Sequence, residues 1–181
     1  MIDLRELNVD LYSSVTITDE RITFPLWNLS GQMIGYQSYR PTGPKGHSKD
    51  VLPQDMRYFT YISKIENTSK IAVFGVEQLS RTCSYSNVCF LVEGIFDAVP
   101  FHNLNLNCLG LLGVGDRPNK ELLNHLRSLG YLLVAVCEDD KAGKNLRKYS
   151  DKSLYLENGQ DPGDLKTEGV RMFLHENGFD V

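Results

Sequence analysis

Two nearly continuous apolar runs, each bounded by turn residues, organise the second half of the chain. They span 88–92 and 131–136, and runs of this kind are typical of strands buried on both faces of a parallel sheet. A further run, interrupted by Gly110, covers 107–112. Between these runs, residues 119–129 place leucines at helical spacing before Gly130. The alternation of strand and helix predicts an α/β unit whose central, mainly parallel sheet is flanked by helices.

The first half of the chain has a different pattern. Residues 21–37 read as two strands around an Asn-Leu-Ser-Gly turn, which predicts a hairpin. We therefore expect a smaller, mixed α/β and largely antiparallel lobe over residues 1–85, followed by the parallel-sheet domain over 86–168. The amphipathic segment 169–181 is expected to form a C-terminal helix.

Carboxylates follow three apolar runs: Glu93 and Asp97 come after 88–92, Glu138 and Asp140 after 131–136, and Asp161 and Asp164 after a further short run at 154–156. Parallel strands end at one edge of their sheet, where ligands bind in such folds. Several carboxylates gathered there repel one another unless a cation neutralises them, and an all-oxygen ligand set favours Mg²⁺ or Mn²⁺ over zinc. Any one of these acids could instead be a helix cap or a solvated loop residue.

At these positions the chain resembles the Toprim family, in the form found in the catalytic core of bacterial and phage primases. Glu93-Gly94 with Asp97 is similar to the glutamate motif of the family and its primase extension. Residues 138–143, Glu-Asp-Asp-Lys-Ala-Gly, resemble the Asp-x-Asp motif with the basic residue, Ala and Gly that follow it in primases. Asp161-Pro162 resembles the later acidic motif.

Two positions depart from the family pattern. Glu138 stands where the family usually has Asp, which keeps the charge but lengthens the side chain by one methylene. Gly163 occupies a position that is often acidic, with Asp164 next to it.

Upstream, residues 21–37 are similar to the hairpin that opens the primase core. Since topoisomerases and Toprim nucleases lack this segment, its presence favours a primase.

The resemblance implies synthesis of short RNA primers on single-stranded DNA from ribonucleoside triphosphates. It implies two Mg²⁺ or Mn²⁺ ions held by Asp97, Glu138, Asp140, Asp161 and Asp164, with Glu93 acting either as a ligand or as an acid/base group. Lys141 and Lys144 beside this cluster are candidates for contact with triphosphate oxygens. A Toprim nuclease, or a non-catalytic subunit of a phage replication or transcription assembly, remains the alternative.

The charge distribution bears on template binding. The net charge of −4 arises from residues 91–181, because residues 1–90 hold equal numbers of basic and acidic residues. The segment 40–57 is locally basic, and Arg40 and Arg57 beside aromatic residues are the candidates there for nucleotide or template phosphates. With few cations in the first half, we expect template recognition to require a helicase or zinc-binding partner protein.

The cysteines and the lengths of the apolar runs bear on metal binding and on the cellular location of the protein. The cysteines form no Cys-x-x-Cys pair, and Cys108 and Cys137 lie in apolar context, so buried thiols are expected and zinc is not. No apolar run approaches the roughly 20 residues of a membrane span, and the N-terminus lacks a secretory signal. A cytoplasmic location is expected, in the host if the protein is phage-encoded.

Overall fold

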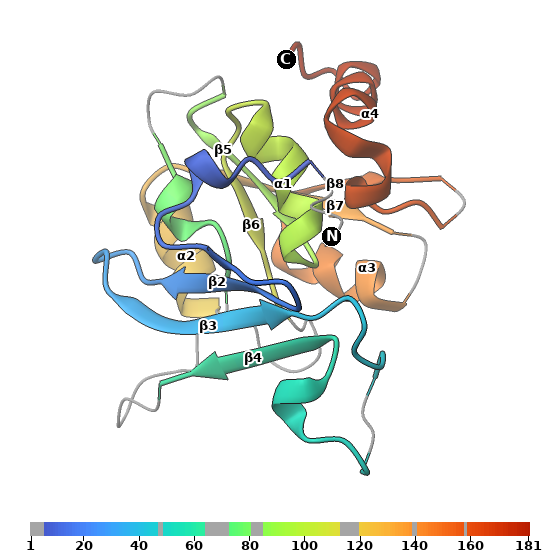
Figure 1. Cartoon of the computed structure of the whole chain (residues 1–181). Coiled ribbons are helices and arrows are strands. Elements are labelled where there is room, and N and C mark those ends of the chain that lie inside the picture. The colour runs from blue at the N-terminus through green and yellow to red at the C-terminus, as the bar shows by residue number, and fades with distance from the viewer. Residues whose placement is uncertain are drawn as a thin grey trace.

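The computed structural model describes residues 6–46, 49–63, 73–80, 85–112, 120–138, 141–157 and 159–181, with residues 141 and 142 described by their backbone alone. Its strands form two four-stranded sheets, A and B. Figure 1 shows sheet A at one end of the molecule, with the α-helices all gathered around sheet B.

Sheet A is antiparallel and contains the predicted hairpin. Its strands follow chain order: β1 (Thr16–Ile17), β2 (Ile22–Trp27), β3 (Met33–Tyr39) and β4 (Tyr58–Ile62). β4 lies at one edge and pairs with β3, Tyr36 opposite Tyr61 and Tyr39 opposite Tyr58. Because side chains alternate along a strand, these two pairs face opposite sides of the sheet.

Sheet B is parallel, and its strands confirm those predicted from the apolar runs at 88–92, 107–112 and 131–136. Its strands are β5 (Val88–Val92), β6 (Cys108–Gly110), β7 (Leu132–Cys137) and β8 (Lys152–Tyr155), in the spatial order β6-β5-β7-β8. Every residue of β5 is buried, because helices cover both faces of the sheet. This explains why the run is continuously apolar rather than alternating.

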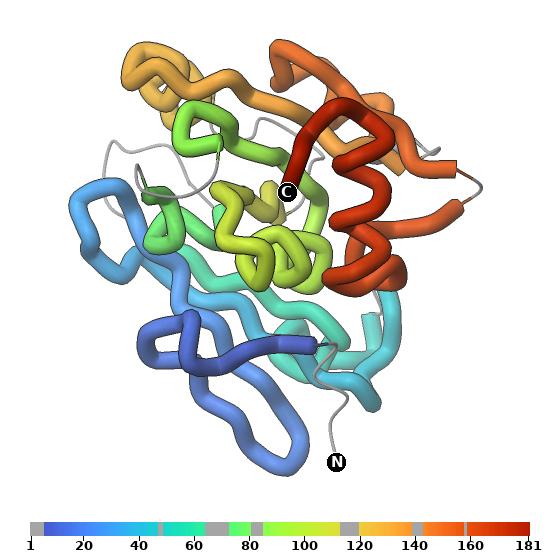
Figure 2. The backbone as a smooth tube through the Cα atoms, turned by 90° about the horizontal axis from the view of Figure 1, so that it is seen from above, coloured from blue at the N-terminus to red at the C-terminus, as the bar shows by residue number. Residues whose placement is uncertain are grey.

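The helices divide between the two faces of sheet B. α1 (Ile95–Asn103) and α4 (Pro162–Glu176) pack on one face, and α2 (Lys120–Ser128) and α3 (Lys141–Leu146) on the other. α4 lies against α1, as Figures 1 and 2 show. α4 begins earlier than residue 169, because Asp161 caps it and Pro162 occupies its first turn; Lys166, with φ 59°, interrupts it.

Aromatic side chains join sheet A to α1. The Phe96 ring packs edge-on against Tyr39 and Phe24 of sheet A, with centroid separations of 4.8 and 5.9 Å. Phe24 in turn contacts Phe74 at 5.6 Å. These residues belong to one continuous apolar core that includes side chains from both sheets, so sheet A is held in a fixed position over the start of α1.

A buried polar chain ties the N-terminal segment to sheet B. The His102 Nε2–H donates to the Cys108 carbonyl oxygen at 2.9 Å, which leaves Nδ1 to accept from the Tyr12 hydroxyl at 2.8 Å. Burial lowers the pKa of His102 to about 4, so the ring is neutral near pH 7. These two hydrogen bonds thus satisfy both ring nitrogens of the buried His102 imidazole.

The expectation of buried thiols is confirmed within the described chain. Cys89, Cys108 and Cys137 are buried free thiols. No described helix is both long and apolar enough to cross a bilayer.

Removing the Tyr12 hydroxyl should destabilise the fold. Tyr12→Phe leaves the buried Nδ1 of His102 without its donor, which costs about 1–3 kcal/mol of unfolding free energy. Urea unfolding at pH 7 measures the loss. The exposed Tyr155→Phe is the matched control, and an equal, small effect of both variants would contradict the role of the hydroxyl.

The neutral state of His102 should also make the fold sensitive to acid. Burial depresses its pKa from the usual 6.5 to about 4, so its contribution to stability is fully present above about pH 6.5 and is lost as the pH falls through about 4. We expect the His102 ring resonances in NMR spectra to titrate near pH 4. A midpoint near 6.5 would contradict the burial.

Candidate active site

The two central strands of sheet B end side by side, and each is followed by a glutamate. β5 and β7 pair in parallel, with Leu91 opposite Ala135, so Glu93 and Glu138 leave the sheet at the same edge. Both are partly buried and line one cavity of about 320 Å³. The parallel pairing therefore brings together the first residues of two acidic motifs that are separated in the sequence.

Asp97 lies in the same cavity because α1 starts directly after Glu93. The Gly94 N–H donates to Asp97 Oδ2 at 2.9 Å, which turns this carboxylate back toward the end of β5. A Cβ on Gly94 would lie only 2.9 Å from that oxygen, so glycine permits the close approach. Asp97, the third residue of α1, thus satisfies the backbone N–H of the N-cap residue Gly94 and lines the cavity at once.

Asp161 reaches the cavity from the start of α4. Its Oδ1 accepts a hydrogen bond from the Asp164 N–H at 2.6 Å, as an N-cap side chain does. The side chain of Asp164 itself is exposed and does not line the cavity. The structure therefore brings Glu93, Asp97, Glu138 and Asp161 together and leaves Asp164 at the surface.

Gly163 explains how two of these carboxylates come to face each other. A Cβ on Gly163 would lie 3.2 Å from Oδ1 of Asp97, from Oδ1 of Asp161 and from the carbonyl oxygen of Phe96. The missing side chain thus allows the start of α4 to press against the start of α1. The departure of Gly163 from the acidic family pattern has a packing reason here.

Gly143 has a similar effect on Glu138. A Cβ at this position would clash with the Glu138 carbonyl oxygen and would lie 2.8 Å from the Glu138 nitrogen. α3 therefore folds back directly onto the backbone of Glu138, which fixes the direction in which this residue leaves β7. The glycine of the Lys-Ala-Gly sequence is required by this contact.

Sheet A supplies the opposite wall of the cavity through Gln37 and Tyr58. The Gln37 amide donates to Thr60 Oγ1 at 2.8 Å, and Tyr58 is 46% exposed. Sequence reasoning did not identify either residue as part of the site. The alternation of the strands places both on the inner face, but only the docking of sheet A onto α1 shows that this face meets the acidic cluster.

The surroundings of the cluster are suited to oxygen ligation. Burial raises the pKa of the Cys108 and Cys137 thiols, and the charges of Asp97 and Glu93 respectively add to that effect. Neither thiol is among the described residues that line the cavity, so the donors these residues offer there are carboxylate oxygens, as Mg²⁺ or Mn²⁺ prefers. Among the described residues, no three acidic, His or Cys side chains are already grouped closely enough to hold an ion.

Two predicted site residues fall outside this description. Asp140 lies outside the described residues, and so does the side chain of Lys141.

The basic candidates have different surroundings. Arg40 forms ion pairs with Glu20 at 3.4 Å and Asp55 at 3.2 Å, and Arg57 Nε donates to the Gly43 carbonyl oxygen at 3.1 Å. Arg40 thereby links the end of β3 to Asp55, and Arg57 links the start of β4 to Gly43. Lys144 is exposed on α3.

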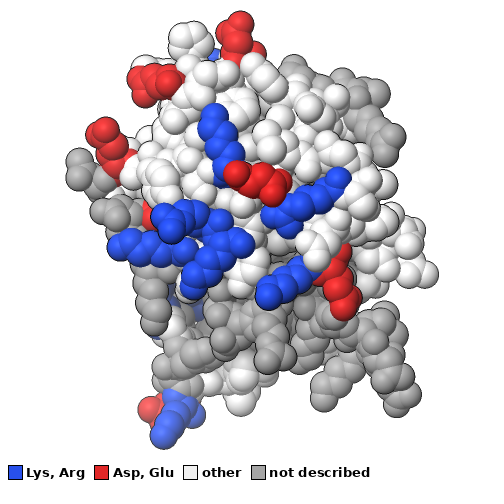
Figure 3. Space-filling model, turned by 180° about the vertical axis from the view of Figure 1, so that it is seen from behind, with Lys and Arg blue, Asp and Glu red and all other residues white. Residues whose placement is uncertain are grey.

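Further basic residues extend the surface around Lys144. Arg147 and Lys148 follow it in the chain and are exposed as well. Figure 3 shows Lys and Arg side chains gathered across the middle of the face that is hidden in Figure 1.

Comparison with known proteins gives the fold but no match by sequence, since no family model and no curated protein matches the chain. The RNA polymerase domain of Mycobacterium tuberculosis primase DnaG superposes with a TM-score of 0.63 at 18% identity, covering 96% of this chain and 62% of that one. The Aquifex aeolicus primase, comprising zinc-binding and RNA polymerase domains, gives 0.63 at 20% identity over 87% and 40%. The Escherichia coli primase catalytic core gives 0.61 at 15% identity over 93% and 58%.

These chains share the primase-core fold, with an antiparallel lobe before a parallel sheet flanked by helices. The present chain spans roughly half the length of the primase structures that it matches.

The contact at Gly143 predicts an unusual response to alanine. At an exposed helix position Gly→Ala stabilises by about 1 kcal/mol, but Gly143→Ala should destabilise by about 1–3 kcal/mol because the new Cβ meets the Glu138 backbone. Thermal unfolding measures the sign. Asn145→Ala on the same helix, which loses only a surface hydrogen bond from Lys148, is the control. A stabilised Gly143→Ala variant would show that α3 does not pack as described.

Proposed function

We propose that this chain is a Toprim-type DNA primase core, which joins ribonucleotides into short primers on a single-stranded DNA template. One observation carries the proposal: the acids singled out by the motif resemblance, Glu93, Asp97, Glu138 and Asp161, line one cavity in a chain with the primase-core fold. The similarity covers 96% of the chain, sheet A included, which supports a primase over a nuclease that has the parallel-sheet unit alone.

Two divalent ions, Mg²⁺ or Mn²⁺, are proposed as cofactors. Asp97, Glu138 and Asp161 would hold them, together with Asp140 from the same motif as Glu138; Asp164, which the structure leaves at the surface, would not. Bound there, such ions would lower the pKa of a primer 3′-hydroxyl and would offset charge on the pyrophosphate leaving group. Glu93, at the base of the cavity, is proposed as a further ligand or as the acid/base group.

The chain itself supplies phosphate binding and positioning. Residues 141–148 contain four basic and no acidic residue, and Lys144 lies on the helix that follows Glu138. We propose that Lys141 and Lys144 contact triphosphate oxygens, while Gln37 and Tyr58 on the opposite wall position the incoming nucleotide. Arg57, at the edge of sheet A, is proposed to contact the template, and Arg40 to hold that edge in place through its ion pairs.

Structures with this fold have been solved with DNA. The M. tuberculosis domain is known in complex with a double-stranded DNA oligomer that carries a 6-nucleotide overhang, and a DnaG primase catalytic domain has been solved bound to ssDNA. This supports single-stranded DNA as the template of the present chain. A helicase or zinc-binding protein is proposed as a partner, because the first half of the chain has no net charge with which to bind template phosphates.

Conservative changes at the acids should separate metal binding from helix capping. Asp97→Asn keeps an oxygen that can accept from the Gly94 N–H, so the fold should retain its melting temperature. Primer synthesis should nevertheless fall by about two orders of magnitude or more, because a metal-binding charge is lost. Glu138→Gln should behave in the same way, whereas Glu138→Asp should retain or raise activity.

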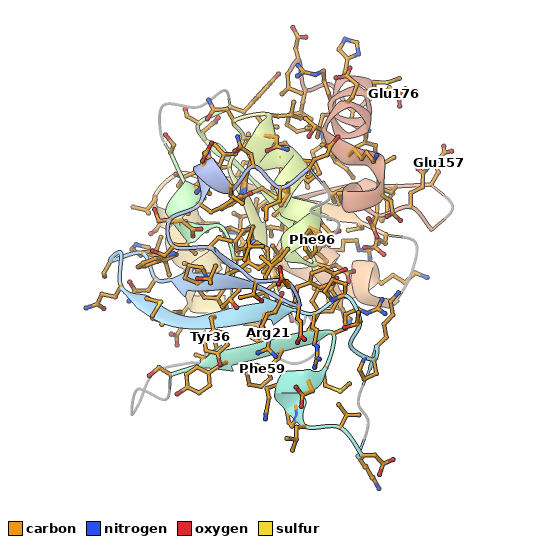
Figure 4. All side chains as sticks on the ribbon, viewed as in Figure 1. Arg21, Tyr36, Phe59, Phe96, Glu157 and Glu176 are labelled. Carbon is orange, nitrogen blue, oxygen red and sulfur yellow. The ribbon has the colours of Figure 1, made fainter. Side chains whose placement is uncertain are left out.

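The measurement is incorporation of labelled ribonucleotides on single-stranded DNA during a Mg²⁺ or Mn²⁺ titration. Glu157→Gln is the matched control, since Glu157 is exposed and Figure 4 shows it at the periphery. Undiminished synthesis by the folded Asp97→Asn and Glu138→Gln variants would refute the assignment. Cleavage of labelled DNA without synthesis by the parent chain would identify a nuclease, and inactivity in both assays a non-catalytic subunit.

A further inference from the structure

Three aromatic side chains share the outer face of sheet A, opposite the face that meets the active site. Tyr36 pairs with Tyr61, and Phe59 is two residues from Tyr61 on the same strand. The Tyr36 ring stacks on Tyr61 with a centroid separation of 5.5 Å and an interplanar angle of 30°, and meets Phe59 edge-on at 6.1 Å. Tyr61 is 50% exposed, so the rings form a row open to solvent.

Basic side chains flank this row. Figure 4 shows Tyr36 and Phe59 on sheet A, and Arg21, just before β2, donates to the Gln54 carbonyl oxygen at 3.4 Å. On the edge of β4, Phe59 lines a groove of about 680 Å³ together with Lys45 and Arg57. Among the described residues, those that line this groove include two cations and no acid.

The groove is continuous with the active site at one residue. Tyr58 lines both the groove and the cavity that holds the acidic cluster. Because β4 is an edge strand of sheet A, an extended chain can pass around that edge from the outer face to the cavity. The outer aromatic row, the basic groove and the cavity thus lie along one path.

We propose that the outer face of sheet A is a stacking platform for single-stranded DNA. Unpaired bases stack on Tyr36, Phe59 and Tyr61, and the strand then passes Lys45, Arg57 and Tyr58 to the active site. The assignment of this strand as the template rests on the proposed primase function, whereas binding to the platform does not.

Single-stranded DNA accounts for this surface better than a purely structural role, a protein partner or duplex DNA. A cross-strand aromatic pair also stabilises a sheet, but that role explains neither the cations beside it nor the continuity with the cavity. A protein partner would require a broad apolar surface, whereas flat rings beside an acid-free basic groove match the bases and phosphates of a single strand. Duplex DNA offers no free base faces for stacking.

The test removes aromatic rings while keeping apolar side chains. Tyr61→Leu and Tyr36→Leu are compared with the parent by fluorescence anisotropy, without metal or nucleotide, on a 12-nucleotide oligothymidine and on an abasic oligonucleotide of the same length. Each variant should bind oligothymidine about 10-fold more weakly, as expected for the loss of one stacked base. Binding of the abasic strand should not change.

Controls separate stacking from folding and from charge. Tyr61→Trp keeps a stacking surface and should restore binding to oligothymidine. Tyr155→Leu, at a tyrosine of sheet B that is 52% exposed, should have no effect. Lys45→Gln should weaken binding of both oligonucleotides and reduce the salt dependence, with a slope smaller by about 0.7.

Two outcomes would overturn the platform: unchanged oligothymidine affinity in folded Tyr61→Leu and Tyr36→Leu, or an equal loss on the abasic strand. The first would leave the aromatic row as a purely structural or protein-binding surface. A failure of the primase proposal is distinct, because it would appear as absent nucleotide incorporation by a chain that still binds oligothymidine through Tyr61.

Discussion

β5 and β7 are buried between helices and paired in parallel, and the rest of the site depends on that pairing. Strands of this kind need continuously apolar side chains, so the first polar residue after each strand appears where the sheet ends. In this chain that residue is a glutamate in both cases. The hydrophobic packing of sheet B therefore places Glu93 and Glu138 in the same cavity, although like charges gathered in one cavity repel each other.

The same fold limits that repulsion through helix termini. Asp97 and Asp161 accept hydrogen bonds from backbone N–H groups at the starts of α1 and α4. Negative charge is favourable at a helix N-terminus, where backbone donors have no partner within the helix. Two acids of the proposed metal centre thus also stabilise helices. Asp97 and Asp161 can therefore cap a helix and bind a metal ion, and the two roles do not exclude each other.

Close backbone approach completes the geometry. Gly143 allows α3 to lie on the Glu138 backbone, and Gly163 allows α4 to lie beside Asp97. On the other side, the contacts of Phe96 with sheet A bring Tyr58 and Gln37 over the acids. The cavity is therefore formed by the packing of two sheets whose strands are far apart in sequence, and its walls are as fixed as the core between them.

The sequence by itself determined the strands of sheet B, the hairpin of sheet A and the edge at which the acids collect. These features depend on local patterns: apolar runs, turn residues and the alternation of strand with helix. Asp140, which the Glu-Asp-Asp-Lys-Ala-Gly motif assigns as a ligand, remains a prediction from sequence.

Only the tertiary structure decided which residues complete the site. It placed Tyr58 on two surfaces at once, paired Arg40 with Glu20 and Asp55, and left Asp164 exposed. These outcomes depend on how sheet A docks on α1 and where α4 begins. Such docking is set by the shape of a shared core, which joins residues distant along the chain and has no counterpart in any local pattern.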